Sequence, residues 1–218
     1  MVLRLVDLSH PIEDGMETYP GIPGPAISDH LSREASRKVY APGTEFQLGR
    51  LEMIGNTGTY LDTPFHRFAD GHDLADVPLD AVAAVPGVVL DTPGPAIGPE
   101  VFDDVDLAGR AVLLRTGWSR HWRTPAYGAG GHPHLTAAAT ERLVELGPTL
   151  VGIDSLNIDD TATGERPAHT GLLGAGIYVL EHLTALDQLD QPDFEVFAVP
   201  LKVRGMGTSP VRAFALWR

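Results

Sequence analysis

Short apolar runs separated by glycine and proline predict a chain built mainly from β-strands. Some segments alternate apolar and polar residues, as a strand with one buried face does. Others are continuously apolar, which is typical of strands buried on both faces. The segments with these patterns are Leu3–Leu8, Phe46–Ile54, Val88–Leu90, Ala111–Thr116, Leu150–Ile153, Phe194–Val203 and Ala213–Trp217.

Helical patterns are few. Thr136 ahead of Ala137–Leu146, with Gly147 behind it, predicts a capped helix. Val77–Val85 has the pattern of a second, short helix, and Gly171–Leu180 is compatible with either a helix or a strand. Many strands with few helices predict an α/β or α+β fold around a central mixed sheet.

The segment Gly55–Phe68 concentrates the residue types that perform chemistry. It places Asp62 and His66 among glycine, threonine and proline residues. The β-branched threonines, the permissive glycines and Pro64, which forces Thr63 towards an extended conformation, exclude an ordinary amphipathic helix. We expect a closely specified backbone path that holds polar side chains inward, and this favours an enzyme over a domain without a site.

Composition narrows the function classes. The chain has 218 residues, 43% of them hydrophobic, which suits a single domain over residues 1–218. Its formal charge of −13 argues against nucleic-acid partners and against an anionic membrane surface. It contains no cysteine, so disulfides, thiolate zinc sites and cysteine nucleophiles are excluded. With neither a secretory signal nor a membrane-spanning apolar run in the sequence, we expect a cytoplasmic protein.

Several polar residues lie at positions where their side chains could perform chemistry, such as the ends of apolar runs. Glu181 closes the apolar run Ile177–Leu180, and a buried carboxylate needs a partner or a metal. Asp154 closes the predicted strand Leu150–Ile153, and His169 lies in a loop-like stretch. Taken singly, each of these residue types is more often structural than functional. Phosphate-loop, dinucleotide-binding and serine-nucleophile signatures are absent from the sequence.

The segment Gly55–Phe68 resembles the H-x-G-T-H-x-D-x-P-x-H motif of the cyclase-like metal-dependent hydrolases, the family of bacterial kynurenine formamidase and isatin hydrolase. Other motifs of that family occur in order along the chain, at Asp7–Ile12, Leu113–Trp118, Gly152–Asp154, His169 with Glu181, and Pro200–Arg212. The resemblance implies an α/β chain with the swivelling β/β/α fold, in which helices flank a central mixed β-sheet. It also implies a homodimer or larger homo-oligomer, and a hydrolytic site with one or two divalent metals, commonly zinc or manganese.

The resemblance assigns roles residue by residue, and two motif positions depart from it. Asn56 and Tyr60 stand where the family has metal-binding histidines, whereas Asp62, His66, His169 and Glu181 are kept. We therefore expect one Zn or Mn ion held by Asp62, His169 and Glu181, with His66 in proton transfer.

Three further residues have two interpretations each. Tyr60 and Asn56 either hydrogen-bond a developing oxyanion or fill the space of absent ions. Tyr19 occupies the place of an aromatic side chain that covers the substrate, with plain packing as the rival role.

Three functions remain open at this point. The first is metal-dependent hydrolysis of a C–N bond in a small-molecule amide, formamide or lactam, as in the kynurenine formamidases of tryptophan catabolism. The second is a cyclase or ring-opening enzyme for a lactone or polyketide-type substrate with little metal dependence. The third is a ligand-binding protein that has lost catalysis on the same scaffold.

Overall fold

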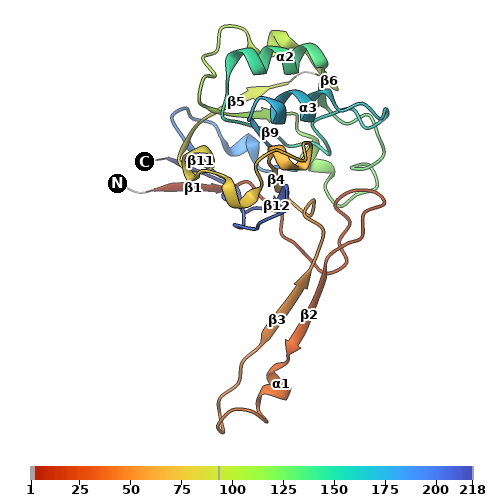
Figure 1. Cartoon of the computed structure of the whole chain (residues 1–218), viewed down its shortest axis with the longest axis vertical. Coiled ribbons are helices and arrows are strands. Elements are labelled where there is room, and N and C mark those ends of the chain that lie inside the picture. The colour runs from red at the N-terminus through yellow and green to blue at the C-terminus, as the bar shows by residue number, and fades with distance from the viewer. Residues whose placement is uncertain (1–2, 93, 218) are drawn as a thin grey trace.

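A nine-stranded mixed sheet forms the centre of the computed structural model, which describes residues 3–92 and 94–217 (Figure 1). Its strands, in spatial order, are β1 (Arg4–Asp7), β13 (Phe214–Trp217), β11 (Glu195–Phe197), β5 (Val85–Asp91), β7 (Ala111–Arg115), β9 (Leu150–Ile153), β10 (Tyr178–Glu181), β4 (Tyr60–Asp62) and β12 (Thr208–Pro210). The central strands β5, β7, β9 and β10 pair in parallel, and the strands outside them pair antiparallel.

Two packed helices cover one face of the parallel strands (Figure 1). They are α2 (Ala137–Leu146) and α3 (Pro167–Gly174). Strand β7 is buried on both faces: Leu113 enters one apolar cluster, and Val112 and Leu114 enter the other. This double burial explains why the strand is continuously apolar in sequence.

Short elements complete the body of the molecule. A two-stranded parallel sheet is formed by β6 (Ala96–Ile97) and β8 (His134–Leu135), and β8 directly precedes α2 in sequence. Single 3-10 turns are found at η1 (Pro64–His66), η2 (Leu74–Asp76), η3 (Leu79–Ala81), η4 (Pro99–Phe102), η5 (Trp118–His121) and η6 (Leu186–Gln188). Within the described ranges, none of the helices is long and apolar enough to cross a membrane.

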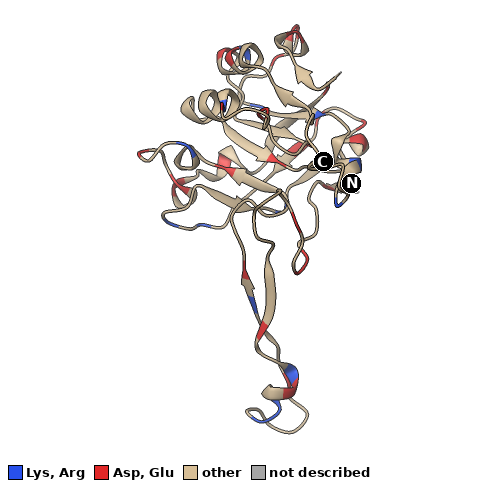
Figure 2. Ribbon diagram, turned by 90° about the vertical axis from the view of Figure 1, so that its right-hand side faces the viewer, with Lys and Arg blue, Asp and Glu red and all other residues tan. Residues whose placement is uncertain are grey.

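An extended arm projects from this body, in both views (Figures 1 and 2). We define the arm as residues 26–52; it consists of β2 (Ala26–Leu31), the single-turn helix α1 (Arg33–Ser36) and β3 (Leu48–Glu52). Both strands are almost wholly exposed. Large apolar side chains of the arm in contact with solvent are Ile27, Val39, Tyr40, Phe46, Leu48 and Leu51.

The predicted elements agree with the structure in most places. The strands predicted around Leu3–Leu8, Val88–Leu90, Ala111–Thr116, Leu150–Ile153 and Ala213–Trp217 are confirmed, and α2 has the predicted bounds, with Thr136 accepting from the Ala139 N–H and Gly147 at φ 64°. The open segment Gly171–Leu180 contains both alternatives, because α3 ends at Gly174 and β10 begins at Tyr178.

Two predictions need correction. The helix expected over Val77–Val85 is wrong: only the turn Leu79–Ala81 forms, and Val85 already belongs to β5. The left-handed backbone of Ala84, at φ 56°, and the missing N–H of Pro86 stop a helix there. The strand expected over Phe194–Val203 is limited to Glu195–Phe197, and the chain leaves the sheet before Pro200.

Candidate metal centre and active site

Strand β4 carries the centre of the candidate site. It lies between β10 and β12, with Tyr60 opposite Glu181 and Asp62 opposite Thr208. Because strand side chains alternate, Leu61 enters the apolar core while Tyr60 and Asp62 point to the other face. All three side chains are buried. The alternation therefore turns both polar groups of β4 towards the same side of the sheet.

The turn after β4 brings His66 over Asp62. Thr63 is extended, at ψ 166°, as expected before proline, and Pro64 opens the 3-10 turn η1. His66 ends that turn with its side chain about one-third exposed, and its Nδ1 lies 3.7 Å from Oδ1 of Asp62. The expected tight backbone path through this segment is thus a short strand followed by a single turn.

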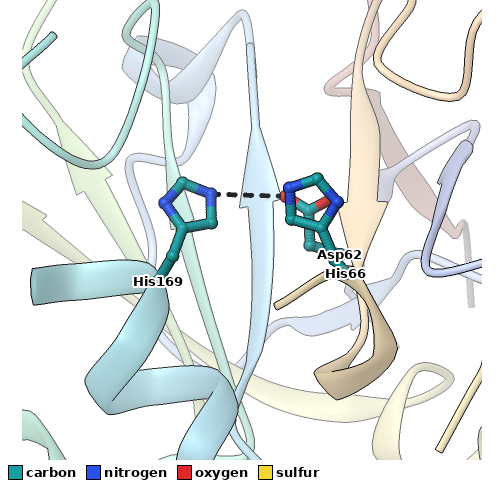
Figure 3. Close-up of side chains that lie close together, drawn as sticks. All are labelled: Asp62, His66 and His169. Atoms are coloured by element: carbon teal, nitrogen blue, oxygen red, sulfur yellow. Dashed lines mark ion pairs between the residues drawn. The ribbon is translucent and has the colours of Figure 1, made fainter. Parts of the chain in front are cut away.

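His169 completes a compact group of side chains that could hold a metal ion (Figure 3). It projects from α3, and its Nε2 lies 3.6 Å from Oδ2 of Asp62. One ligand atom from each of Asp62, His66 and His169 falls within 4.8 Å of the others. Glu181 adjoins this group, because its Oε1 is 3.8 Å from Nε2 of His169.

The chemistry of these groups fits a divalent cation. Oδ2 of Asp62 is buried and has no hydrogen-bond partner among the described residues. An unpaired buried carboxylate oxygen is costly unless a cation or a donor meets it. Ligand atoms around a tetrahedral Zn²⁺ with bonds of 2.0–2.1 Å lie about 3.3 Å apart. The separations of 3.6 and 3.8 Å from His169 to Asp62 and Glu181 are close to this spacing.

Asp159 fixes the orientation of His169. Its Oδ2 accepts from Nδ1 of His169 at 2.6 Å and from the His169 backbone N–H at 3.0 Å, and its Oδ1 accepts from the Ala168 N–H at 2.6 Å. A carboxylate that holds one ring nitrogen of a histidine while the other faces a metal is a common supporting contact in metal sites. Burial disfavours the charged His169, yet Glu181, Asp159 and Asp62 outweigh burial and raise its pKa to about 10.

Tyr60 and Glu181 form a buried pair beside this group. The Tyr60 hydroxyl donates to Oε2 of Glu181 at 2.6 Å, and the Ile158 N–H donates to Oε1 at 2.6 Å. Asn56 lies close to the Tyr60 hydroxyl and acts to lower its pKa, against the larger effect of burial. Burial, together with the nearby Asp62 carboxylate, raises the pKa of Glu181 to about 7 in spite of His169. Burial also raises the pKa of Tyr60 well above its usual value, so the phenol stays neutral and donates.

A cavity of about 280 Å³ opens over these residues. Its lining residues are Tyr19, Ile22, Asn56, Tyr60, His66, Arg67, Asn157, Arg166, His169 and Glu181. Asp62 lies buried beside the cavity, in contact with His66 and His169. The structure thus brings together all seven residues that the sequence nominated for the site.

One candidate residue from the sequence lies outside the site, and two residues of the site were not predicted. The carboxylate of Asp154 accepts hydrogen bonds from the backbone N–H groups of Thr116 and Gly117 and from the Thr116 hydroxyl. Asp154 is not among the residues that line the cavity. Sequence reasoning missed Thr208, whose hydroxyl donates to Oδ1 of Asp62 and lies 2.8 Å from Nδ1 of His66. It missed Asp159 too, because this residue reaches the Ala168 N–H from nine residues upstream, whereas Arg166 occupies the N-cap position.

Comparison with known proteins places this chain in a family. Residues 6–160 match the family model described as "Putative cyclase", and the chain belongs to that family. It is 31% identical over 210 residues to the kynurenine formamidase of Bacillus cereus, covering 95% of each chain. It is 30% identical over 214 residues to the kynurenine formamidase of Polaromonas naphthalenivorans, covering 97% of this chain and 90% of the relative.

Solved structures support the same assignment at the level of the fold. Isatin hydrolase A from Labrenzia aggregata superposes with a TM-score of 0.80 at 24% identity, over 98% of this chain and 93% of that one. A protein from Bacillus stearothermophilus described as a "predicted metal-dependent hydrolase" gives a TM-score of 0.76 at 24% identity, over the whole of both chains. The expected α/β fold with a central mixed sheet, the swivelling β/β/α fold of this family, is therefore confirmed.

Proposed function

We propose that this protein is a metal-dependent hydrolase that cleaves the C–N bond of a small amide, formamide or lactam. The observation that carries the proposal is the unpaired, buried Oδ2 of Asp62, which faces Nε2 of His169 beside a cavity. Membership of the cyclase family and the formamidase names of the relatives support the choice of reaction. For a formamide, the reaction adds water across the C–N bond and releases formate and an amine.

Asp62, His169 and Glu181 would hold one divalent metal, zinc or manganese. Such a metal, when bound, lowers the pKa of water and polarises a carbonyl group. Asp159 holds Nδ1 of His169, so a bound metal would take the place of the proton on Nε2. The Ile158 N–H and the Tyr60 hydroxyl fix the two oxygens of Glu181. The ligand set is therefore held in place by contacts within the chain.

His66 is the residue we assign to proton transfer. It is the most exposed member of the ligand group, and it lines the cavity. The Thr208 hydroxyl donates its hydrogen to Asp62, so the Thr208 oxygen can only accept from Nδ1–H of His66. Nε2 of His66 is then available to substrate or water. An imidazole with one nitrogen fixed and the other free is suited to general acid–base catalysis.

Tyr60, Asn56 and Tyr19 complete the proposed site. Asn56 and Tyr60 occupy the positions of two family histidines and contact each other, which supports one metal ion rather than two. Their amide and hydroxyl groups line the cavity, where they would face negative charge that develops on a carbonyl oxygen. Tyr19 lines the same cavity and would cover the bound substrate.

Elemental analysis of protein purified without chelator or affinity-tag metal tests this proposal. We expect about one zinc or manganese per chain, and loss of that metal in Glu181→Ala. Hydrolysis of a formamide should fall about 100-fold or more in Asp62→Ala and in His169→Ala. Asp70→Ala, which removes an exposed carboxylate a few residues away, serves as the matched control.

Two experimental outcomes would contradict the proposal and favour another function. Activity that survives exhaustive chelation but is lost in His66→Ala would favour the metal-independent cyclase. Metal-free protein that stays folded and gains no turnover with added zinc or manganese would favour a ligand-binding protein.

The arm supports a homo-oligomer, most simply a homodimer. It exposes six large apolar side chains, three on its two strands and three in the segment that joins them, and it makes little contact with the body (Figure 1). An isolated two-stranded ribbon is marginally stable in water. A second copy of the chain that packs on the arm would bury these side chains and stabilise its conformation.

A further inference from the structure

Two arginines without acidic partners line the cavity. Neither Arg67 nor Arg166 forms an ion pair within 4.0 Å in the described part of the chain. The lack of an ion pair at these two arginines is unusual in a chain with 29 acidic and 16 basic residues. Most of the other described arginines form an ion pair with a carboxylate. Glu165 lines an adjoining hollow together with both arginines, but it pairs with neither of them.

Contacts with neutral groups hold both side chains. Nε of Arg67 donates to the Thr170 hydroxyl at 3.1 Å, and its guanidinium lies 5.2 Å from the ring centre of Phe68. Nη1 of Arg166 donates to the backbone carbonyls of Thr163 at 2.8 Å and Glu165 at 2.6 Å. These contacts leave further N–H groups on each guanidinium, and arginine stays charged at any ordinary pH. Both guanidinium groups are therefore positioned and still able to bind.

The charge balance of the cavity leaves these two cations uncompensated. Its carboxylates are Glu181 in the lining and Asp62 beside it, and both belong to the proposed metal set. The Asp159 carboxylate, behind His169, is already bound by the His169 ring and by two backbone N–H groups of α3. A divalent cation would offset both negative charges. The charges of Arg67 and Arg166 then remain, and two like charges that share one cavity favour an anion between them.

The geometry points to a carboxylate-binding subsite: we propose that Arg67 and Arg166 bind a carboxylate group of the substrate. The substrate would then be an amide or formamide that carries a carboxylate near its scissile bond. The reaction rests on the proposed function, whereas the anion-binding role of the arginines rests only on its metal, which offsets the charges of Asp62 and Glu181.

A carboxylate suits this subsite better than a phosphate group. Each guanidinium presents a planar fork that matches carboxylate and phosphate alike, so the choice depends on the other groups of the cavity. Phosphate sites commonly add the free N–H groups of a helix N-terminus. At the start of α3 those of Ala168 and His169 already donate to Asp159. The cavity, at about 280 Å³, is also at the small end of ligand pockets.

Matched substrates test the subsite in the metal-loaded enzyme. Formanilide has no charge, and its 2-, 3- and 4-carboxylate derivatives add one anion at increasing distances from the formamide. We expect kcat/KM to be about 10- to 100-fold higher for the best carboxylate than for formanilide, as for a hydrogen bond between charged groups. The preference should shrink at high ionic strength.

Substitutions assign the preference to the arginines. Arg67→Gln and Arg166→Gln should each reduce the carboxylate preference about tenfold, and Arg166→Lys should restore part of it. Arg142→Gln removes the same charge from the outer surface of α2, where Arg142 pairs with Glu145, and it should leave the preference unchanged. An equal preference in wild type and Arg67→Gln/Arg166→Gln, or none in wild type, would overturn the proposal.

Calorimetric titration separates this proposal from the reaction itself. If none of the four formamides is hydrolysed, the hydrolase proposal fails, and the subsite is judged by binding of benzoate against benzamide. Benzoate should bind wild type more tightly than benzamide and lose about tenfold in affinity in Arg67→Gln/Arg166→Gln. Unchanged benzoate affinity in that variant would reject the carboxylate subsite.

Discussion

Tyr60 occupies a position where the resemblance places a metal-binding histidine, and it changes what that position can do. Its hydroxyl donates to Glu181 at 2.6 Å and is a neutral group at any ordinary pH because burial raises its pKa. A neutral donor stabilises a carboxylate without competing for a cation. The pair Asn56 and Tyr60 therefore supports Glu181 where a second metal ion would otherwise do so.

Restoring both histidines should add a second metal. In Asn56→His/Tyr60→His, two imidazoles face the Glu181 carboxylate, and histidine with carboxylate is a suitable zinc set. Elemental analysis should rise from about one to about two metals per chain. Tyr60→Phe, which removes only the hydroxyl, serves as the control and should not gain a metal. A double variant that still holds one ion would show that the backbone geometry, not the side chains, limits the number of metals.

His10 should make the protein less stable in mild acid. Burial lowers its pKa to about 4, so below the ordinary value of about 6.5 the unfolded chain takes up a proton that the folded protein does not. The free energy of unfolding should therefore fall as the pH drops from about 6.5 to about 4, by up to ~1.4 kcal/mol per pH unit from this residue. Urea denaturation at several pH values measures the slope.

His10→Phe isolates that contribution. The His10 ring stacks on Trp122 at 4.0 Å, and its buried Nε2 has no partner among the described residues. Phenylalanine keeps a stacked ring and removes the titrating group, so the slope should be shallower than in wild type. Parallel slopes for the two proteins would mean that His10 does not control the acid sensitivity.

At the scale of elements, the site depends on how closely β12 approaches the turn η1. The Gly207 carbonyl accepts from the Thr63 N–H at 2.8 Å, and a Cβ added at Gly207 would overlap the backbone of Phe65 and His66. Only glycine permits this contact. The closeness of the two elements is what brings Thr208 to Asp62 and His66.

Gly207→Ala should therefore damage stability and activity together. Because the overlap is with backbone rather than with a flexible side chain, we expect a loss of about 1–3 kcal/mol, as for other overpacked sites. Formamide hydrolysis should fall as η1 moves His66 away from Thr208. Gly164→Ala is the control, since a Cβ there meets nothing within 4 Å. Equal melting temperatures for the two variants would contradict this account.

Sequence patterns predicted elements best where one signal dominates. The continuous apolar run of β7 and the capped helix α2 were both found, because double burial and capping residues are local signals. Strand β2 was not predicted, since Ser28, Asp29 and His30 give it a polar sequence. Its order comes from pairing with β3, which is a property of two segments and not of either one.

The same distinction applies to the candidate site. Asp62 and His66 stand in one short motif, and His169 and Glu181 in a second cluster, so the resemblance could name them. Thr208 reaches Asp62 across 146 residues of sequence, and although it lies within the motif Pro200–Arg212, that motif does not single out Thr208 as a site residue. Contacts that depend on the order of strands in the sheet become visible only in the folded chain.

At the scale of the whole molecule, the arm is the feature that the body does not explain. Leu51 lies on β3 with its side chain about half exposed, at 51%. Leu51→Glu should place a charge in the proposed interface and shift the protein towards single chains, seen by light scattering after size exclusion. Leu79→Glu changes an equally apolar, exposed position on the body and should not alter the molar mass. A wild-type protein that already runs as one chain would refute the interface.

The pairing of β1 with β13 also has a consequence for how a newly made chain matures. Arg4 stands opposite Trp217, so within the described sheet the neighbour of β1 is made more than 200 residues later in synthesis (Figure 1). Until then β1 and the edge of β11 that later receives β13 stay unpaired, and unpaired strand edges promote association with other chains. Slow translation near residue 200 would prolong this vulnerable period. A chaperone bound to the emerging chain would cover the unpaired strand edges during that time.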